Sequence, residues 1–232
     1  MSEITVRRLG LMPYKAAWDY QEQLFAGMVD TKISKGHYEG DDYLLLVEHP
    51  PVFTIGKSGR LEHLLGSESL LQEKGIELFR NNRGGDITYH GPGQLVVYPV
   101  LDLEHYFTDI RKYMRSLEEV VIRILKEYDI AGQRSEGETG VWLDVHLPQK
   151  VRKICAMGVR TSRWVTMHGL ALNVNTDLSY FDWIVPCGIS DKGVTSMRKE
   201  TGKEIAMEDI EAAVIRHFGE VFEVAIKEDR TC

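Results

Sequence analysis

KICAMGVRTSRWVTMHGLALNV, residues 153 to 174, contains two apolar runs on either side of a short polar stretch. Lys153–Arg160 and Val165–Val174 have the length and the composition of strands. The polar residues between them, Thr161-Ser-Arg163, suit a hairpin connection. The segment therefore predicts two neighbouring strands of one sheet.

Further strands and helices follow one another irregularly in the rest of the chain. Short apolar runs next to proline, glycine or polar residues predict strands at Asp42–Val47, Val52–Ile55, Gln94–Leu103 and Val141–Leu143. Apolar residues at helical spacing predict helices at Tyr14–Val29, Phe107–Tyr128 and Met207–Val221. This order, without regular βαβ alternation, predicts an α+β fold with a mixed or antiparallel sheet flanked by helices. No linker divides the chain, so residues 1–232 are expected to form a single domain.

The composition is that of a globular protein: 43% of the 232 residues are hydrophobic and 27% are charged. A formal net charge of −7 argues against non-specific nucleic-acid binding. The longest apolar run, Tyr43–Val47, is far too short to span a bilayer, and the first residues lack the apolar stretch of a secretory signal. The three cysteines show no CxxC spacing. We therefore expect a cytoplasmic protein that binds neither nucleic acid nor membrane.

One basic segment departs from the acidic average. No acidic residue occurs between Val145 and Thr176, where the chain places Lys150, Arg152, Lys153, Arg160 and Arg163. One interpretation is a strand face that is simply solvated. The other is a docking surface for an acidic or phosphorylated partner.

Cys187 is the cysteine whose surroundings suit a nucleophile. Pro186 restricts the residue before it, and Gly188 leaves the backbone after the thiol open to close approach. The alternative is a buried structural cysteine, which fits Cys155 within its strand and Cys232 at the last position better.

A nucleophilic cysteine also needs a partner that favours the thiolate. A lysine ammonium ~4 Å away contributes about 1 kcal/mol at the dielectric of water and about 4 kcal/mol at an effective dielectric of ~20. A Cys–Lys pair is therefore effective only when it is shielded from solvent. Lys153, at the start of an apolar strand, is the lysine best placed for this role, although a strand-end charge in water is the ordinary interpretation of a lysine there.

Two glycine-rich turns complete the candidate site. Arg83-Gly-Gly85 lets the backbone approach a ligand, and its amides are suited to a carbonyl oxygen or a developing oxyanion. Most such glycines merely form turns. His90 and His168, read individually, are better explained as structural than as catalytic.

Taken together, these segments resemble the lipoyl(octanoyl) transferase family, within the biotin and lipoate protein ligase superfamily. The resemblance rests on RGGDITYHGPGQ at 83–94, KICAMGVR at 153–160, HGLALNVN at 168–175, and DLSYFD at 177–182 leading into Pro186-Cys-Gly188. It covers about residues 43–198, with the lysine and the cysteine 34 positions apart (187 minus 153). Two residues depart from the pattern: Asp86 stands where many relatives have Gln or Lys, and Cys155 where the residue is often small.

The resemblance implies an α+β catalytic domain and a specific acyl transfer. The donor is octanoyl-acyl carrier protein, and the acceptor is a lysine of a lipoyl domain in a 2-oxoacid dehydrogenase or in the glycine cleavage H protein. Cys187 corresponds to the thioester nucleophile, and Lys153 to the lysine that favours the thiolate and acts as general acid and base. No metal or other cofactor is implied. The implied substrate-binding residues are Arg83, Gly84, Gly85, Asp86, Ile87, Thr88, Tyr89, His90, Ala156, Met157, Gly158, Gly169, Leu170 and Ala171.

Three other functions remain open at this point. An ATP-dependent lipoate or biotin protein ligase has the same fold but gives Cys187 no role. A non-catalytic module that binds acyl carrier protein uses the basic segment and gains no covalent adduct. A cysteine hydrolase using His90 or His168 is the most distant alternative.

Overall fold

The computed structural model describes residues 3–66, 68–185 and 192–228. Its strands are β1 (Glu3–Leu11), β2 (Asp42–Glu48), β3 (Val52–Ile55), β4 (Glu77–Arg80), β5 (Ile87–His90), β6 (Gln94–Val100), β7 (Val141–Leu143), β8 (Arg152–Ser162), β9 (Val165–Asn173), β10 (Gly193–Val194) and β11 (Ala225–Glu228). Its α-helices are α1 (Tyr14–Lys35), α2 (Glu68–Glu73), α3 (Ile110–Glu127), α4 (Met197–Thr201) and α5 (Met207–Phe222). Short 3-10 helices cover Leu61–His63, Leu103–His105 and Leu178–Trp183.

Within these ranges the strands form two sheets. The larger one has the order β10-β8-β9-β6-β2-β1-β11, with β7 paired to β8. Its centre, from β8 through β9 and β6 to β2, is antiparallel, whereas β1 runs parallel to both β2 and β11. The smaller sheet has the order β4-β3-β5. The fold is therefore α+β with a mixed sheet, as the sequence predicts.

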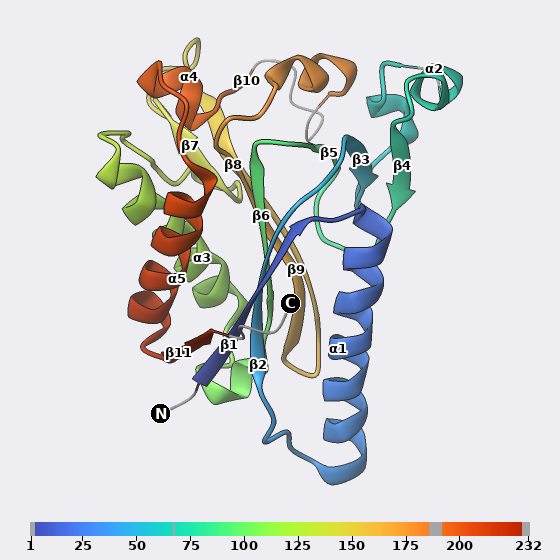
Figure 1. The fold of residues 1–232 in the computed structure, drawn as a ribbon, viewed down its shortest axis with the longest axis vertical. Coiled ribbons are helices and arrows are strands. Elements are labelled where there is room, and N and C mark those ends of the chain that lie inside the picture. Colours follow the sequence, from blue (N-terminus) through green and yellow to red (C-terminus); the bar gives the residue numbers. More distant parts are fainter. Residues whose placement is uncertain (1–2, 67, 186–191, 229–232) are drawn as a thin grey trace.

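Helices cover both faces of the large sheet (Figure 1). Leu44 and Leu46 of β2 belong to the core cluster that contains the buried residues of α3 and α5. Leu45 and Val47 belong to the cluster that includes Phe25 of α1. Because successive side chains of a strand point to opposite faces, the unbroken apolar run of β2 is the pattern of a strand covered on both sides.

The predicted elements are present, with some changed boundaries. The helix that starts at Tyr14 continues to Lys35. The strand that starts at Gln94 ends at Val100, because the chain then turns into a 3-10 helix capped by the Asp102 side chain. The hairpin turn predicted at Thr161–Arg163 is instead Arg163-Trp164: both have positive φ, and Ser162 pairs directly with Val165.

Candidate active site

A cavity lies where β5 of the small sheet meets β6, β9 and β8 of the large one. Thirteen of the predicted site residues line it: Arg83, Gly85, Asp86, Ile87, Thr88, His90, Lys153, Ala156, Met157, Gly158, Gly169, Leu170 and Ala171. These come from three separate segments of the sequence. The topology therefore brings the predicted segments together around one space.

Two predicted residues lie elsewhere. The ring of Tyr89 stacks on that of Tyr180, with 4.6 Å between centroids, and belongs to the core of the small sheet. The N–H of Gly84 donates to the carbonyl of Val159 in β8 at 2.9 Å. The expectation that the Gly84 amide serves an oxyanion is therefore wrong in this arrangement, because that donor is already used.

Arg83 holds the glycine loop in shape. Its guanidinium donates to the carbonyl oxygens of Thr54 at 2.8 Å, Asp86 at 2.7 Å and Gly84 at 3.0 Å. These bonds tie the loop to itself and to β3. The backbone position of Arg83-Gly-Gly85 is thus fixed by a buried charged side chain.

Close backbone approach explains two of the predicted glycines. A Cβ on Gly158 would lie 2.4 Å from the carbonyl oxygen of Gly84, and a Cβ on Gly169 would lie 2.1 Å from that of Val97. Real Cβ atoms do not come so close to backbone oxygens. The glycine loop and β6 are therefore able to pack against β8 and β9 only because these positions have no side chain.

The carboxylate of Asp86 is occupied by the protein itself. Its oxygens lie 2.5 Å from Nδ1 of His63 and accept from the backbone N–H of Ile87 at 2.7 Å and of Arg60 at 3.3 Å. Asp86 therefore joins the 3-10 helix at Leu61–His63 to the cavity wall.

His90 belongs to a hydrogen-bonded chain that the sequence analysis did not find. Its Nδ1 lies 2.7 Å from Oε1 of Gln94, whose Nε2 donates to Oδ1 of Asn173 at 2.8 Å. Asn173 in turn donates to the carbonyl of Thr195 at 2.9 Å. Burial lowers the pKa of His90 to about 3, so the ring is neutral.

His168 is also a neutral, structural histidine. Burial, with the nearby charges of Arg83 and Arg160, lowers its pKa to about 3. Its Nε2 lies 2.8 Å from Oδ1 of Asn82, and its backbone N–H donates to the Gln21 side chain at 3.0 Å. Neither His90 nor His168 is suited to act as a base near neutral pH.

Lys153 lies at the start of β8, half-buried, and lines the cavity. Its Nζ lies 4.3 Å from the ring centroid of Trp142, the residue directly opposite it on β7. Thr139, from the loop before β7, lines the same cavity.

The predicted nucleophile, Cys187, lies outside the described residues, but the chain is anchored on both sides of it. Before it, the N–H of Val185 donates to the carbonyl of His63 at 2.7 Å. After it, Val194 of β10 pairs with Lys153 of β8 and lines the cavity.

Cys155, in contrast, is fully buried in the core. Burial raises the pKa of its thiol well above the usual range. It therefore does not present a thiolate.

Several lining residues were missed by the sequence analysis: Tyr14, Gln94, Val96, Tyr98, Thr139, Asn173, Phe181 and Val194. Gln94 and Asn173 lie inside the quoted motifs, so the hydrogen-bonding capacity of their side-chain amides could have indicated that they belong to the site. Tyr14 and Phe181 reach the cavity from a distant helix and a 3-10 helix. No local sequence pattern predicts that these two side chains line the cavity.

The basic segment does not form one docking surface. Arg152 pairs with Glu200 at 2.6 Å and also with Asp144, while Arg160 pairs with Glu22 at 2.8 Å. Lys150 and Arg163 are exposed, but they lie beyond opposite ends of the eleven-residue strand β8. That length separates them by roughly 35 Å. Arg152 and Arg160 are therefore not free positive charges in this structure.

No helix within residues 3–66, 68–185 and 192–228 is both long enough and apolar enough to cross a membrane.

The chain is similar to known proteins over nearly its whole length. Residues 13–219 match the family model "Lipoyl protein ligase A/B catalytic domain". The octanoyltransferase of Christiangramia forsetii is 57% identical, covering 97% of this chain and 98% of that protein. The octanoyltransferase of Flavobacterium psychrophilum is 56% identical, covering 96% and 98%.

A solved structure from Thermoplasma acidophilum, of a bipartite lipoate protein ligase and its E2 lipoyl domain, has the same fold. Its TM-score is 0.69 at 20% identity, and the match covers 99% of this chain and 87% of that one. Since the family model spans most of the chain and the relatives exceed half identity, this chain belongs to the lipoyl protein ligase A/B catalytic domain family.

Proposed function

We propose that this chain takes an octanoyl group from acyl carrier protein as a thioester on Cys187, and passes it to a lysine of a lipoyl domain. Its high similarity to octanoyltransferases, together with the family model, identifies the chain as an acyltransferase that moves octanoyl groups in protein lipoylation. The carrier-bound donor, the thioester and the acceptors are the finer part of the proposal. The acceptors we propose are the lipoyl domains of 2-oxoacid dehydrogenases and the glycine cleavage H protein.

The observation that carries the proposal is the pairing of an apolar cavity with a half-buried lysine. Ala156, Met157, Leu170 and Ala171 give the cavity apolar walls, and Lys153 lines the same space. Burying an acyl tail contributes about 0.8 kcal/mol per methylene. Such walls therefore suit an apolar acyl chain, and we propose that its carbonyl lies on the side of the cavity where Lys153 stands.

In the first half-reaction, the Cys187 thiolate attacks the carbonyl carbon of the carrier thioester. A new C–S bond forms to Cys187, and the bond to the pantetheine sulfur breaks. The Lys153 ammonium gives its proton to the departing sulfur, leaving neutral Lys153 beside an uncharged acyl-enzyme.

In the second half-reaction, the lysine amine of the lipoyl domain attacks the Cys187 thioester. The amide C–N bond forms and the C–S bond breaks, which releases the Cys187 thiolate. The proton lost by the amine goes to neutral Lys153, so the ammonium–thiolate pair is restored. No outside activation is needed, because the donor is already a thioester.

Intact mass measurement after incubation with octanoyl-acyl carrier protein tests the proposal. We expect one octanoyl adduct, located by peptide mapping on Cys187, and its loss in Cys187→Ser. Cys155→Ser is the matched control and should keep the adduct, because the Cys155 thiol is buried and has a raised pKa. An adduct on Cys155 or Cys232 would overturn the assignment.

The same measurement separates the alternatives. A non-catalytic binding module gains no adduct. An ATP-dependent ligase gains none on cysteine and transfers acyl groups only when ATP is added. Transfer to a lipoyl domain without nucleotide, through the Cys187 adduct, is the expected result.

A further inference from the structure

The reacting lysine of the proposed mechanism shares an aromatic ring with a second lysine. The Nζ of Lys153 lies 4.3 Å, and the Nζ of Lys192 5.1 Å, from the ring centroid of Trp142. The Lys192 ammonium also pairs with Glu138, with 2.7 Å between Nζ and Oε1. One ring, two ammonium groups and one carboxylate therefore lie together, and one of the four, Lys153, lines the cavity.

Trp142 is fixed in place by its backbone. Its N–H donates to Gln133 at 2.9 Å and its carbonyl accepts from Gln133 at 2.8 Å, while on its other side it pairs with Lys153 of β8. Trp142 as a whole is only 2% exposed. The backbone pairing and the burial together fix where the ring lies beside Lys153.

The indole N–H does not explain why a tryptophan stands here. Trp142 Nε1 is buried and has no hydrogen-bond partner among the described residues. What the ring offers is its face, which attracts a cation more strongly than the ring of tyrosine or phenylalanine does.

Glu138 balances the second charge. Burial raises the pKa of this carboxyl, but hydrogen bonds from Lys192 and Ser135 outweigh that effect and lower it overall, with Lys153 contributing in the same direction. The carboxylate therefore stays charged beside Lys192. Without it, the Lys192 ammonium would act on Lys153 as an unbalanced like charge across the ring.

We propose that Trp142 is a positioning residue that holds the Lys153 ammonium by its ring face, and that the Glu138–Lys192 pair sets the electrostatic balance at which Lys153 exchanges its proton. The inference rests on the proposed function, in which Lys153 transfers protons.

The test is the pH profile of the second half-reaction. Preformed octanoyl-enzyme is mixed with a lipoyl domain in single turnover, and the rate is followed from pH 6 to 10. Removing the ring face in Trp142→Leu disfavours the ammonium, so the midpoint of the profile should move to lower pH by about one unit. The plateau rate should also fall, because Nζ loses its fixed position.

Two further variants distinguish a specific effect on the pH profile from a general folding defect of Trp142→Leu. Trp142→Phe keeps a weaker ring face and loses no observed hydrogen bond, so its midpoint should move in the same direction by less. Glu138→Gln leaves the ring untouched and should also lower the midpoint. Glu127→Gln, which removes a carboxylate from the surface pair with Arg216, is the matched control and should not move it.

Failure of the inference differs from failure of the proposed function. If wild-type enzyme forms the Cys187 adduct but all three variants keep the wild-type midpoint, the ring and the ion pair are merely structural and the inference is wrong. If wild-type enzyme forms no adduct on Cys187, the proposed function falls and takes the inference with it.

Discussion

In the proposed mechanism Lys153 loses a proton and gains one back, so a positive charge alone at this position is not sufficient. Lys153→Arg keeps a cation that is able to stack on Trp142 and to favour a thiolate. A guanidinium, with a pKa above ~12, does not accept a proton from the incoming amine. We therefore expect the second half-reaction to fall by about 100-fold or more, and the first half-reaction to fall less.

Single-turnover rates of the two half-reactions check this prediction. Lys150→Arg, at an exposed lysine just before β8, is the matched control and should behave as wild type. A Lys153→Arg enzyme that deacylates at the wild-type rate would show that another group accepts the proton.

Asp86, which departs from the family pattern, has its carboxylate bound by other groups of the protein. From the sequence, a carboxylate at this position puts donor affinity in question, because it adds negative charge at the acyl entrance. In the structure the Asp86 carboxylate contacts His63, with 2.5 Å between Nδ1 and Oδ2. A histidine 23 positions earlier in the chain is invisible to an analysis of the motif alone.

At the scale of elements, the glycine loop and β8 depend on each other. Gly158→Ala places a methyl group 2.4 Å from the Gly84 carbonyl oxygen, so the loop has to move and the Gly84–Val159 hydrogen bond is lost. Overpacking of this kind costs about 1–3 kcal/mol. We expect that loss in the free energy of unfolding by urea, together with slower formation of the octanoyl adduct.

The matched control is Gly27→Ala on the exposed side of α1, where an added Cβ meets nothing within 4 Å. It should raise the free energy of unfolding by about 0.5–1 kcal/mol, because alanine favours a helix interior over glycine. Equal stability of wild type and Gly158→Ala would show that the loop is able to shift without cost.

The sequence predicted some strands and missed others, and the difference follows from how deeply each strand is buried. β2 and β9 are buried along most of their length, so they stand out as continuous apolar runs. β1, β4 and β11 were missed: β1 has charged residues in its second half, and β4 and β11 are four-residue strands with no fully buried residue. The parallel pairing of β1 with β11 also joins the two ends of the chain, which no local pattern indicates.

The same limit applies to the candidate site. The motif segments predicted most of the lining, because their residues follow one another in the sequence. The Arg160–Glu22 pair, by contrast, joins residues 138 positions apart, so counting charges along the segment overestimated its free positive charge.

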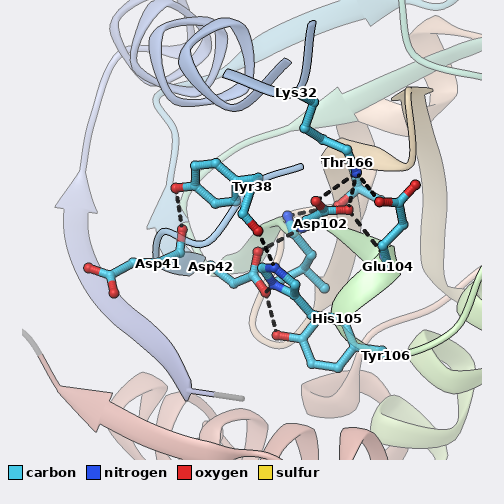
Figure 2. A network of polar contacts seen from close by, with 10 residues as sticks. Lys32, Tyr38, Asp41, Asp42, Asp102, Glu104, His105, Tyr106 and Thr166 are labelled. Carbon is cyan, nitrogen blue, oxygen red and sulfur yellow. Dashed lines mark hydrogen bonds and ion pairs between the residues drawn. The ribbon is translucent and has the colours of Figure 1, made fainter. Parts of the chain in front are cut away.

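At the scale of the whole molecule, a buried polar network joins α1 to the segment that directly follows β6 (Figure 2). Lys32 of α1 pairs with Asp102 at 2.6 Å, and the N–H of Asp102 donates to Asp42 at 2.7 Å. Asp42 also accepts from the Tyr106 hydroxyl at 2.6 Å and lies 2.8 Å from Nδ1 of His105. Gln94, at the cavity, and Asp102 are eight residues apart along β6 and its continuation, roughly 25 Å.

His105 makes this network sensitive to pH. The hydrogen bond to Asp42, supported by the carbonyl of Tyr38 and opposed by partial burial, raises the pKa of His105 to about 9. In the unfolded chain it is about 6.5. Because the folded state holds its proton more tightly, the stabilisation is complete below pH 6.5 and is lost as the pH rises through 9.

We therefore expect the free energy of unfolding by urea to decline between pH 6.5 and 9. His49, whose pKa burial lowers to about 4, titrates below this window, and Tyr38, whose pKa burial raises to about 12, titrates above it. The contribution of His105 is therefore read from the difference between wild type and His105→Gln. His105→Gln should be less stable than wild type at pH 6.5 and should show a flatter decline. His37→Gln, at an exposed histidine near the end of α1, should keep the wild-type slope. A decline that persists unchanged in His105→Gln would assign the pH dependence to groups outside this network.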